Sequence, residues 1–208
     1  DEQLTLVWGK YKKGIIKTAV LCLVAALAWF GYKALSTKKL EAIRNAYSEA
    51  QIADKAKQEE QKKTGDFNPR KDVLSLERTI AFAQKHPNHP LAGYARIEAG
   101  HAYLQIDNFE EAAIHYKAAV EALAKVPEFA GFAHMHYAIS TYRSGDKNTG
   151  KAQLKSISQN TDYLHVHRGE AYYKLGVIAL SEKNMDAYKK HEAELENAGL
   201  EHSTSWLE

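Results

Sequence analysis

Ten histidines are the residues of this chain with the widest chemical range, because imidazole serves as acid, base and metal ligand. Two close pairs stand out, His134 with His136 and His165 with His167, both in segments of helical periodicity. On a helix, residues i and i+2 point about 200° apart, so neither pair can chelate one ion from one face. The sequence has no Gly-rich phosphate loop, nucleophile elbow or metalloprotease motif. We therefore expect surface or packed histidines, with no catalytic residue, no metal and no cofactor.

Carboxylates and the single thiol give no stronger chemical signal. Paired acids such as Glu110 and Glu111 lie on expected helix exteriors, where carboxylates are usually solvated. The one cysteine, Cys22, lies in an apolar run, so no disulfide can form within the chain and the compartment stays open. The formal net charge is +2, with the lysine excess before residue 34. The remainder is near neutral and lacks the basic stripe of nucleic-acid-binding proteins, so we expect no nucleic acid partner.

An apolar run over residues 14–32 is the first element of the chain, and it carries one charge, Lys17. As a helix it would rise about 28 Å, close to the hydrocarbon thickness of a bilayer. Trp29 and Tyr32 lie at one end, where aromatic side chains meet lipid headgroups. The run predicts a membrane anchor surrounded by lipid, with a span at about residues 14–35. It divides the chain into an N-terminal region, residues 1–36, and a soluble domain, residues 37–208.

A cleaved signal peptide and a buried core helix are the alternatives for this run. A signal peptide needs small residues at its cleavage site, whereas bulky residues follow here, from Trp29 to Tyr32. A core helix rarely stays apolar on every face over residues 18–32. Lysines and arginines are balanced on the two sides, so the positive-inside rule gives no orientation. The short leading segment, with residues 4–9 expected at the membrane surface, favours a signal-anchor layout.

Everything after residue 39 has the periodicity of soluble amphipathic helices. Turn signals containing Gly, Pro, Asn and Asp separate these helices, and Asp72 is placed to cap the second of them. Pro127 is expected to close the unit that begins at residue 91. The predicted helices cover residues 40–63, 73–85, 91–105, 109–124, 129–143, 149–157, 165–180 and 185–198.

A period of 38 residues connects the later helices. Gly100, Ala138 and Gly176 recur at this step, each where the two helices of a hairpin are expected to approach most closely. A period of this size built from helix pairs predicts a solenoid. The fold class is therefore all-α, with a single N-terminal transmembrane helix followed by a solenoid of helical hairpins.

The unit over residues 91–127 resembles the tetratricopeptide repeat (TPR). It carries the pattern G-x2-Y…A-x3-F/Y-x2-A…P in a set of matching positions: Gly100, Tyr103, Phe109, Ala112, Tyr116, Ala119 and Pro127. Arg96 stands where the family prefers Trp, and Pro127 comes about three residues late. The later units are more degenerate, with Gly150 and Tyr188 at the alanine position of the second helix.

Stacked TPR hairpins form a groove lined by their first helices, and the resemblance implies which residues face it. With Arg96 at the Trp position, the 38-residue period selects side chains of the types found at binding hot spots. The candidate binding residues are Tyr94, His101, Gln105, Phe132, Met135, Tyr142, Arg143, Glu170 and Tyr173, with Ile97, Leu104, Ile139 and Val177 beside them. The alternative for each is that it packs between repeats.

The whole layout also resembles the YfgM-like ancillary subunits of the bacterial Sec translocon. The matching features are residues 7–13 (VWGKYKK), one span ending in Gly31-Tyr32, Leu40 to Ala42 through Tyr47, and the helix before the unit at Leu91. This resemblance implies a single-pass bacterial inner-membrane protein with a cytoplasmic N-terminus and a periplasmic domain. It also implies the Sec translocon, periplasmic chaperones or client polypeptides as partners.

The sequence thus predicts a non-enzymatic scaffold that mediates protein–protein interactions at the inner membrane. An accessory subunit of another membrane complex, for envelope assembly or a membrane enzyme, is the alternative and shares every sequence feature. A hydrolase or metalloprotein that uses the histidines has no supporting motif.

Overall fold

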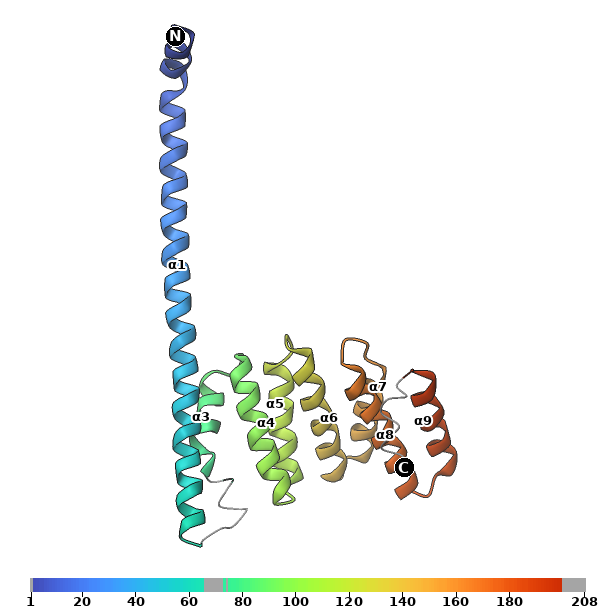
Figure 1. The fold of residues 1–208 in the computed structure, drawn as a ribbon. Coiled ribbons are helices and arrows are strands. Elements are labelled where there is room, and N and C mark those ends of the chain that lie inside the picture. The colour runs from blue at the N-terminus through green and yellow to red at the C-terminus, as the bar shows by residue number, and fades with distance from the viewer. Residues whose placement is uncertain (1, 66–72, 74, 200–208) are drawn as a thin grey trace. The chain divides into compact units, whose positions relative to one another are not determined.

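The computed structural model describes residues 2–65, 73 and 75–199, and regular secondary structure in these residues is entirely helical (Figure 1). The chain divides into two compact units, Asp1–Ala46 and Tyr47–Glu208. The helices are α1 (Glu2–Lys63), α3 (Glu77–Lys85), α4 (Pro90–Gln105), α5 (Phe109–Ala122), α6 (Pro127–Arg143), α7 (Lys147–Gln159), α8 (His165–Ser181) and α9 (Met185–Asn197). The predicted all-α class is confirmed for the described residues.

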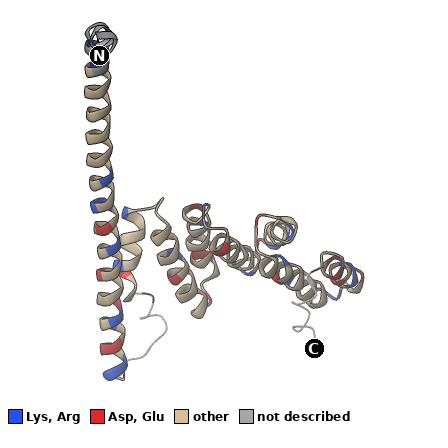
Figure 2. Ribbon diagram, turned by 45° about the horizontal axis from the view of Figure 1, so that its top comes forward, with Lys and Arg blue, Asp and Glu red and all other residues tan. Residues whose placement is uncertain are grey.

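The first unit consists of the N-terminal part of α1. Among the described residues, this is the one helix long and apolar enough to cross a membrane, and none of its apolar window is buried within the chain. Burial in a protein core therefore does not account for its apolar side chains, such as Leu23 and Leu27. Residues 18–32 of this helix carry no charge, and Figure 2 shows a long uncharged stretch in α1, whereas charges of both signs are interspersed on the later helices. The side chains of residues 1–12 and 15 lie outside the described part, so the membrane-surface segment stays a prediction.

α1 is continuous where the sequence analysis expected separate helices before and after residue 40. No proline and no glycine lies between Gly31 and Gly65, so nothing in this stretch breaks the backbone hydrogen bonds. The Thr37 hydroxyl donates to the Lys33 carbonyl at 3.0 Å, one turn back along the helix. The helix ends at Lys63, before Gly65, whose φ of +70° is a left-handed conformation that suits a helix C-terminus.

The second unit begins with the last part of α1, against which α3 packs. The Asp54 carboxylate accepts a hydrogen bond from the Thr79 backbone N–H at 2.8 Å, within the first turn of α3. The N-cap residue of α3, Leu76, makes no side-chain capping bond, so Asp54 supplies the cap from another helix. The predicted capping residue Asp72 lies outside the described residues. Tyr47 and Phe82 pack their rings 5.1 Å apart and complete this contact.

From α3 onward each helix packs against the next one in the chain, so the structure is a sequence of helical hairpins (Figure 1). Small buried residues allow the helices to approach closely. Ala119, Ala130 and Ala133 surround Leu123 in one core cluster, and Ala138 and Ala171 flank Leu154 in the next. The core is therefore a row of small clusters between successive helices.

The turns between paired helices repeat with the 38-residue period. Residues 108, 146 and 184 are Asn, Asp and Asn, and each accepts a hydrogen bond from the backbone N–H three residues later. The residue before each cap, at 107, 145 and 183, has a positive φ. A left-handed residue followed by an Asx cap thus reverses the chain three times in the same way. The predicted helices match the observed ones closely, but Pro127, expected to close a unit, lies in the first turn of α6.

Gly100 and Gly176, two of the predicted close-approach positions, and Gly150 opposite Ala138 differ in the space they leave. A Cβ added to Gly100 would come within 2.8 Å of the buried Tyr116 ring, as expected for a crossing point. At Gly150 the nearest atoms include backbone, the Tyr142 nitrogen at 2.7 Å and the Ala138 carbonyl oxygen at 2.8 Å. At Gly176 the nearest atom is 3.6 Å away, on Tyr188. The expectation of a tight crossing at Gly176 is therefore wrong, because the bulky Tyr188 holds α9 away from α8.

These distances predict different outcomes for the same substitution at two glycines. Gly150→Ala should lower the free energy of unfolding by about 1–3 kcal/mol, because backbone atoms cannot move aside. Gly176→Ala should leave it unchanged or raise it by up to about 1 kcal/mol, since alanine favours the helix. Urea unfolding of both variants checks this difference. An unchanged free energy of unfolding in Gly150→Ala would show that the α6–α7 crossing is not tight, and a loss in Gly176→Ala would show that the α8–α9 crossing is tight.

Candidate functional site

A cluster of rings from α4, α5 and α6 contains two of the ten histidines. This ring cluster consists of His101, Tyr116, Phe132 and His136. His136 stacks on Tyr116 with centroids 5.1 Å apart, and its ring lies 4.4 Å from that of Phe132. His101 lies 5.2 Å from His136 and 5.8 Å from Phe132, and is exposed. The cluster therefore joins buried packing to an exposed face of α4 and α6.

The electrostatics of this cluster keep its imidazoles neutral. Burial lowers the pKa of His136 to about 4, with contributions from His101 and Lys174. Burial also lowers the pKa of His101, against a smaller upward effect of Glu98. The buried hydroxyl of Tyr116 has no hydrogen-bond partner among the described residues. Neutral rings packed against one another fit a packing role better than a proton-transfer role.

The paired histidines contact different neighbours, as their i, i+2 spacing predicts. His134 Nδ1 lies 3.2 Å from the Tyr163 hydroxyl, whereas His136 belongs to the ring cluster. His167 Nε2 donates to the Glu128 carbonyl oxygen at 2.7 Å, and His165 is exposed. Within the described ranges, no three His, Cys, Asp or Glu side chains come together in a group that could hold a metal ion.

A second buried histidine lies between α4 and α5. His115 is 5 % exposed and stacks on Tyr103 with centroids 5.2 Å apart. Arg96 donates from Nη1 to His115 Nδ1 at 3.3 Å. Burial, and then the Arg96 charge, lower the pKa of His115 to about 4. Arg96, at the position where TPR units prefer Trp, thus turns toward the second helix of its hairpin.

Aromatic side chains also meet where α4 and α6 begin. The Tyr94 ring packs edge-on against Phe129 with centroids 4.8 Å apart. Phe129 is 45 % exposed and was not among the sequence candidates. The preceding proline could have indicated this residue. Pro127 is the first residue of α6, two residues before the predicted start, and this places Phe129 in the first turn.

Polar candidates gather where α4, α6 and α8 end. Arg143 lies over the Phe109 ring at 3.9 Å and 3.5 Å from the Asp107 carboxylate. Tyr142 is half-buried and donates its hydroxyl hydrogen to Glu182 at 3.3 Å. Lys151 also binds this carboxylate at 3.0 Å. Gln105 and Arg143 are the exposed members of this group, so they are open to a partner.

Met135 differs from the other candidates. It is 1 % exposed and packs in the core cluster with Leu154, Ile157 and Leu175. The 38-residue period predicts Met135 on the open groove, and this prediction is wrong, because its side chain packs between α6, α7 and α8. The prediction failed because neighbouring residues of one helical turn face different sides, some the open face and others the next hairpin.

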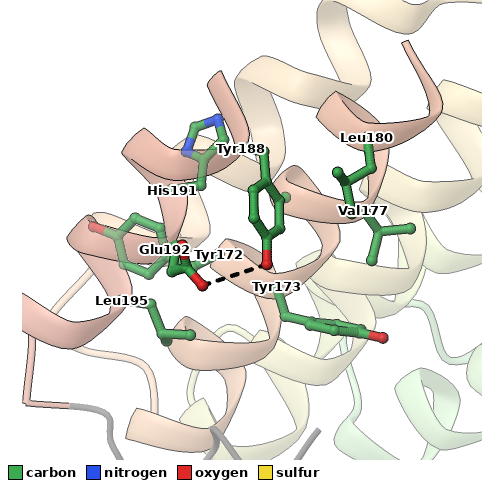
Figure 3. Close-up of a pocket in the computed structure, with 9 residues that line it drawn as sticks. Tyr172, Tyr173, Val177, Leu180, Tyr188, His191, Glu192 and Leu195 are labelled. Atoms are coloured by element: carbon green, nitrogen blue, oxygen red, sulfur yellow. Dashed lines mark hydrogen bonds between the residues drawn. The ribbon is translucent and has the colours of Figure 1, made fainter. Parts of the chain in front are cut away.

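The remaining candidates lie on α8. Glu170 pairs with Lys174 one turn later at 4.0 Å, and both are partly exposed. The Tyr173 ring lies 5.6 Å from Lys174 Nζ. Tyr173 also lines a pocket of about 210 Å³ between α8 and α9 (Figure 3). The sequence analysis did not predict this pocket. The residue that could have indicated it is Tyr188, which stands where the earlier hairpins have the small residues Ala112 and Gly150.

Comparison with protein-family models, curated proteins and solved structures found no match to this chain. The site described above therefore stands on its own geometry. Its exposed aromatic and arginine side chains are of the types that concentrate binding energy in protein interfaces.

Proposed function

We propose that this chain is a membrane-anchored, TPR-like scaffold that docks protein partners on the first helices of its hairpins. One observation carries the proposal: the chain combines an unburied, apolar helix with a row of hairpins whose first helices expose aromatic and polar side chains. The repeated turns at residues 107–108, 145–146 and 183–184 support the TPR-like assignment. A solenoid of this kind offers an extended surface suited to polypeptides.

The partner class follows from the resemblance to YfgM-like subunits. We propose a single span in a bacterial inner membrane, a periplasmic domain, and the Sec translocon with its chaperones or clients as the partners. An accessory role in another membrane complex remains the alternative. Gentle detergent extraction followed by affinity purification and mass spectrometry separates the two by what is recovered. Recovery of translocon subunits supports the translocon proposal, whereas recovery of another membrane complex supports the accessory role.

The same experiment distinguishes an anchor from a cleaved signal sequence. The mature protein, isolated from membranes, should keep residues 14–35 in its intact mass. Loss of these residues would show that the apolar helix is a processed signal.

We expect a double substitution on the exposed face to weaken partner binding. Gln105→Ala with Arg143→Ala should reduce partner capture about tenfold or more, equal to a loss of at least ~1.4 kcal/mol of binding free energy. Arg143 is exposed and contacts Phe109 and Asp107 at the surface, so the fold should survive. Tyr142 is less suitable, because its side chain packs against Gly150. Quantitative pull-down followed by circular dichroism measures both effects.

The matched control removes two exposed residues from a second helix. Lys117→Ala with Glu121→Ala changes α5, outside the proposed docking face, and should leave partner capture unchanged. Normal capture by the Gln105/Arg143 variant would move the interface to the membrane helix or to the second helices.

A further inference from the structure

The pocket between α8 and α9 exists because the last hairpin is more open than the others. Tyr188 occupies the position at which Gly150 stands in the preceding hairpin, and a Cβ at Gly176 would still be 3.6 Å from it. At Gly100 and Gly150 the corresponding space is already filled. The opening therefore results from two residues, a glycine on α8 and a tyrosine on α9.

Tyrosine rings and one carboxylate line this space. Figure 3 shows Tyr173 and Tyr188 reaching it from α8 and α9, with Glu192 beside the Tyr188 hydroxyl. That hydroxyl donates to Glu192 Oε1 at 3.4 Å. The Glu192 charge, followed by burial, raises the pKa of Tyr188, so the two side chains interact.

Glu192 is only partly exposed. Among the described residues, no lysine, arginine or histidine forms an ion pair with it, whereas the neighbouring Glu194 pairs with His191 at 3.0 Å. A half-buried carboxylate beside tyrosine rings attracts a cation through charge and through the negative ring faces. The chain itself provides an example, since Lys174 lies 5.6 Å from the Tyr173 ring.

The size and rim of the pocket indicate what carries the cation. At about 210 Å³ the pocket is smaller than the roughly 300–1,000 Å³ of small-molecule and cofactor sites, and it suits a single side chain. Val177 and Leu180 on its rim are 42 % and 44 % exposed and can contact the residues flanking that side chain.

We propose that this pocket binds the side chain of a lysine or arginine in a partner polypeptide, with the cation against Glu192 and the rings of Tyr173 and Tyr188. The inference rests on the proposed docking function and adds the chemistry of one contact. It concerns α8 and α9, so it can fail while docking on α4 and α6 holds.

The test uses the full chain in phosphatidylcholine nanodiscs and fluorescein-labelled peptides Gly-Ser-Xaa-Val-Ser, where Xaa is arginine, lysine, norleucine or glutamate. Fluorescence anisotropy, corrected with empty nanodiscs, should show the arginine and lysine peptides binding at least about tenfold tighter than the norleucine peptide. Glu192→Gln should remove this preference, and Tyr173→Leu should weaken it. Glu196→Gln, at an exposed residue of the same helix outside the pocket lining, should leave it unchanged.

Three outcomes would overturn the proposal. Equal or tighter binding of the norleucine peptide would identify an apolar pocket. A preference for arginine and lysine that survives Glu192→Gln in a folded protein would place the cation elsewhere. Absence of saturable binding of every peptide would show that the pocket takes no such side chain. A separate measurement of partner capture by the unmodified chain tests the docking function, so failure of the pocket proposal can be distinguished from failure of docking.

Discussion

Replacing Leu23 and Leu27 with arginine should release the protein from the membrane or lead to its degradation. Each arginine near the centre of a span costs about 3 kcal/mol of insertion free energy, so the pair costs roughly 6 kcal/mol. Both side chains are exposed on α1 and lie in its uncharged stretch, so the described part of the chain offers no charged partner to compensate. Carbonate extraction followed by immunoblotting measures the membrane-bound fraction.

The control for this prediction uses apolar residues that are equally exposed in the second unit. Ile52→Arg with Ile114→Arg adds the same two charges, on side chains 66 % and 58 % exposed. That variant should stay membrane-associated, because the changes meet water rather than lipid. Carbonate-resistant association of the Leu23/Leu27 variant would contradict the anchor.

The sequence was sufficient to predict most helices because capping and turn residues mark where they begin and end. Asn108, Asp146 and Asn184 are polar caps that satisfy free backbone N–H groups wherever the helix begins. The continuity of α1 was harder to predict, because a change from apolar to charged composition looks like a boundary. A helical backbone tolerates that change, and α1 contains no proline to interrupt it.

Features that depend on contacts between distant segments could not be predicted. The cap that Asp54 gives to α3 joins residues 25 positions apart, and no local pattern marks it. In the candidate site, the 38-residue period placed Phe132 and Met135 together on the open face, but Met135 is buried. The period identifies which residues are equivalent in successive hairpins, whereas the burial of each side chain depends on the tilt between neighbouring hairpins. The pocket at Tyr188 arises from a departure from the repeat.

The buried histidines predict that the second unit loses stability in mild acid. Burial lowers the pKa of His115 and His136 to about 4, whereas an unfolded histidine titrates near 6.5. The unfolded chain therefore binds protons that the folded chain does not, between about pH 6.5 and pH 4. Stability is complete above about pH 6.5 and falls as the pH decreases through this window.

From about pH 7.5 to about pH 5 the loss should be about 2 kcal/mol for each of these histidines. Urea unfolding of the detergent-solubilised chain at the two pH values measures it. The double variant His115→Gln, His136→Phe keeps an acceptor for Arg96 and a ring against Tyr116, so it should lose most of the pH dependence. His165→Gln, at an exposed histidine, should keep the wild-type slope. Equal unfolding free energies of the wild-type chain at both pH values would contradict neutral, buried imidazoles. The ring cluster would then tolerate charge and accept protons without unfolding.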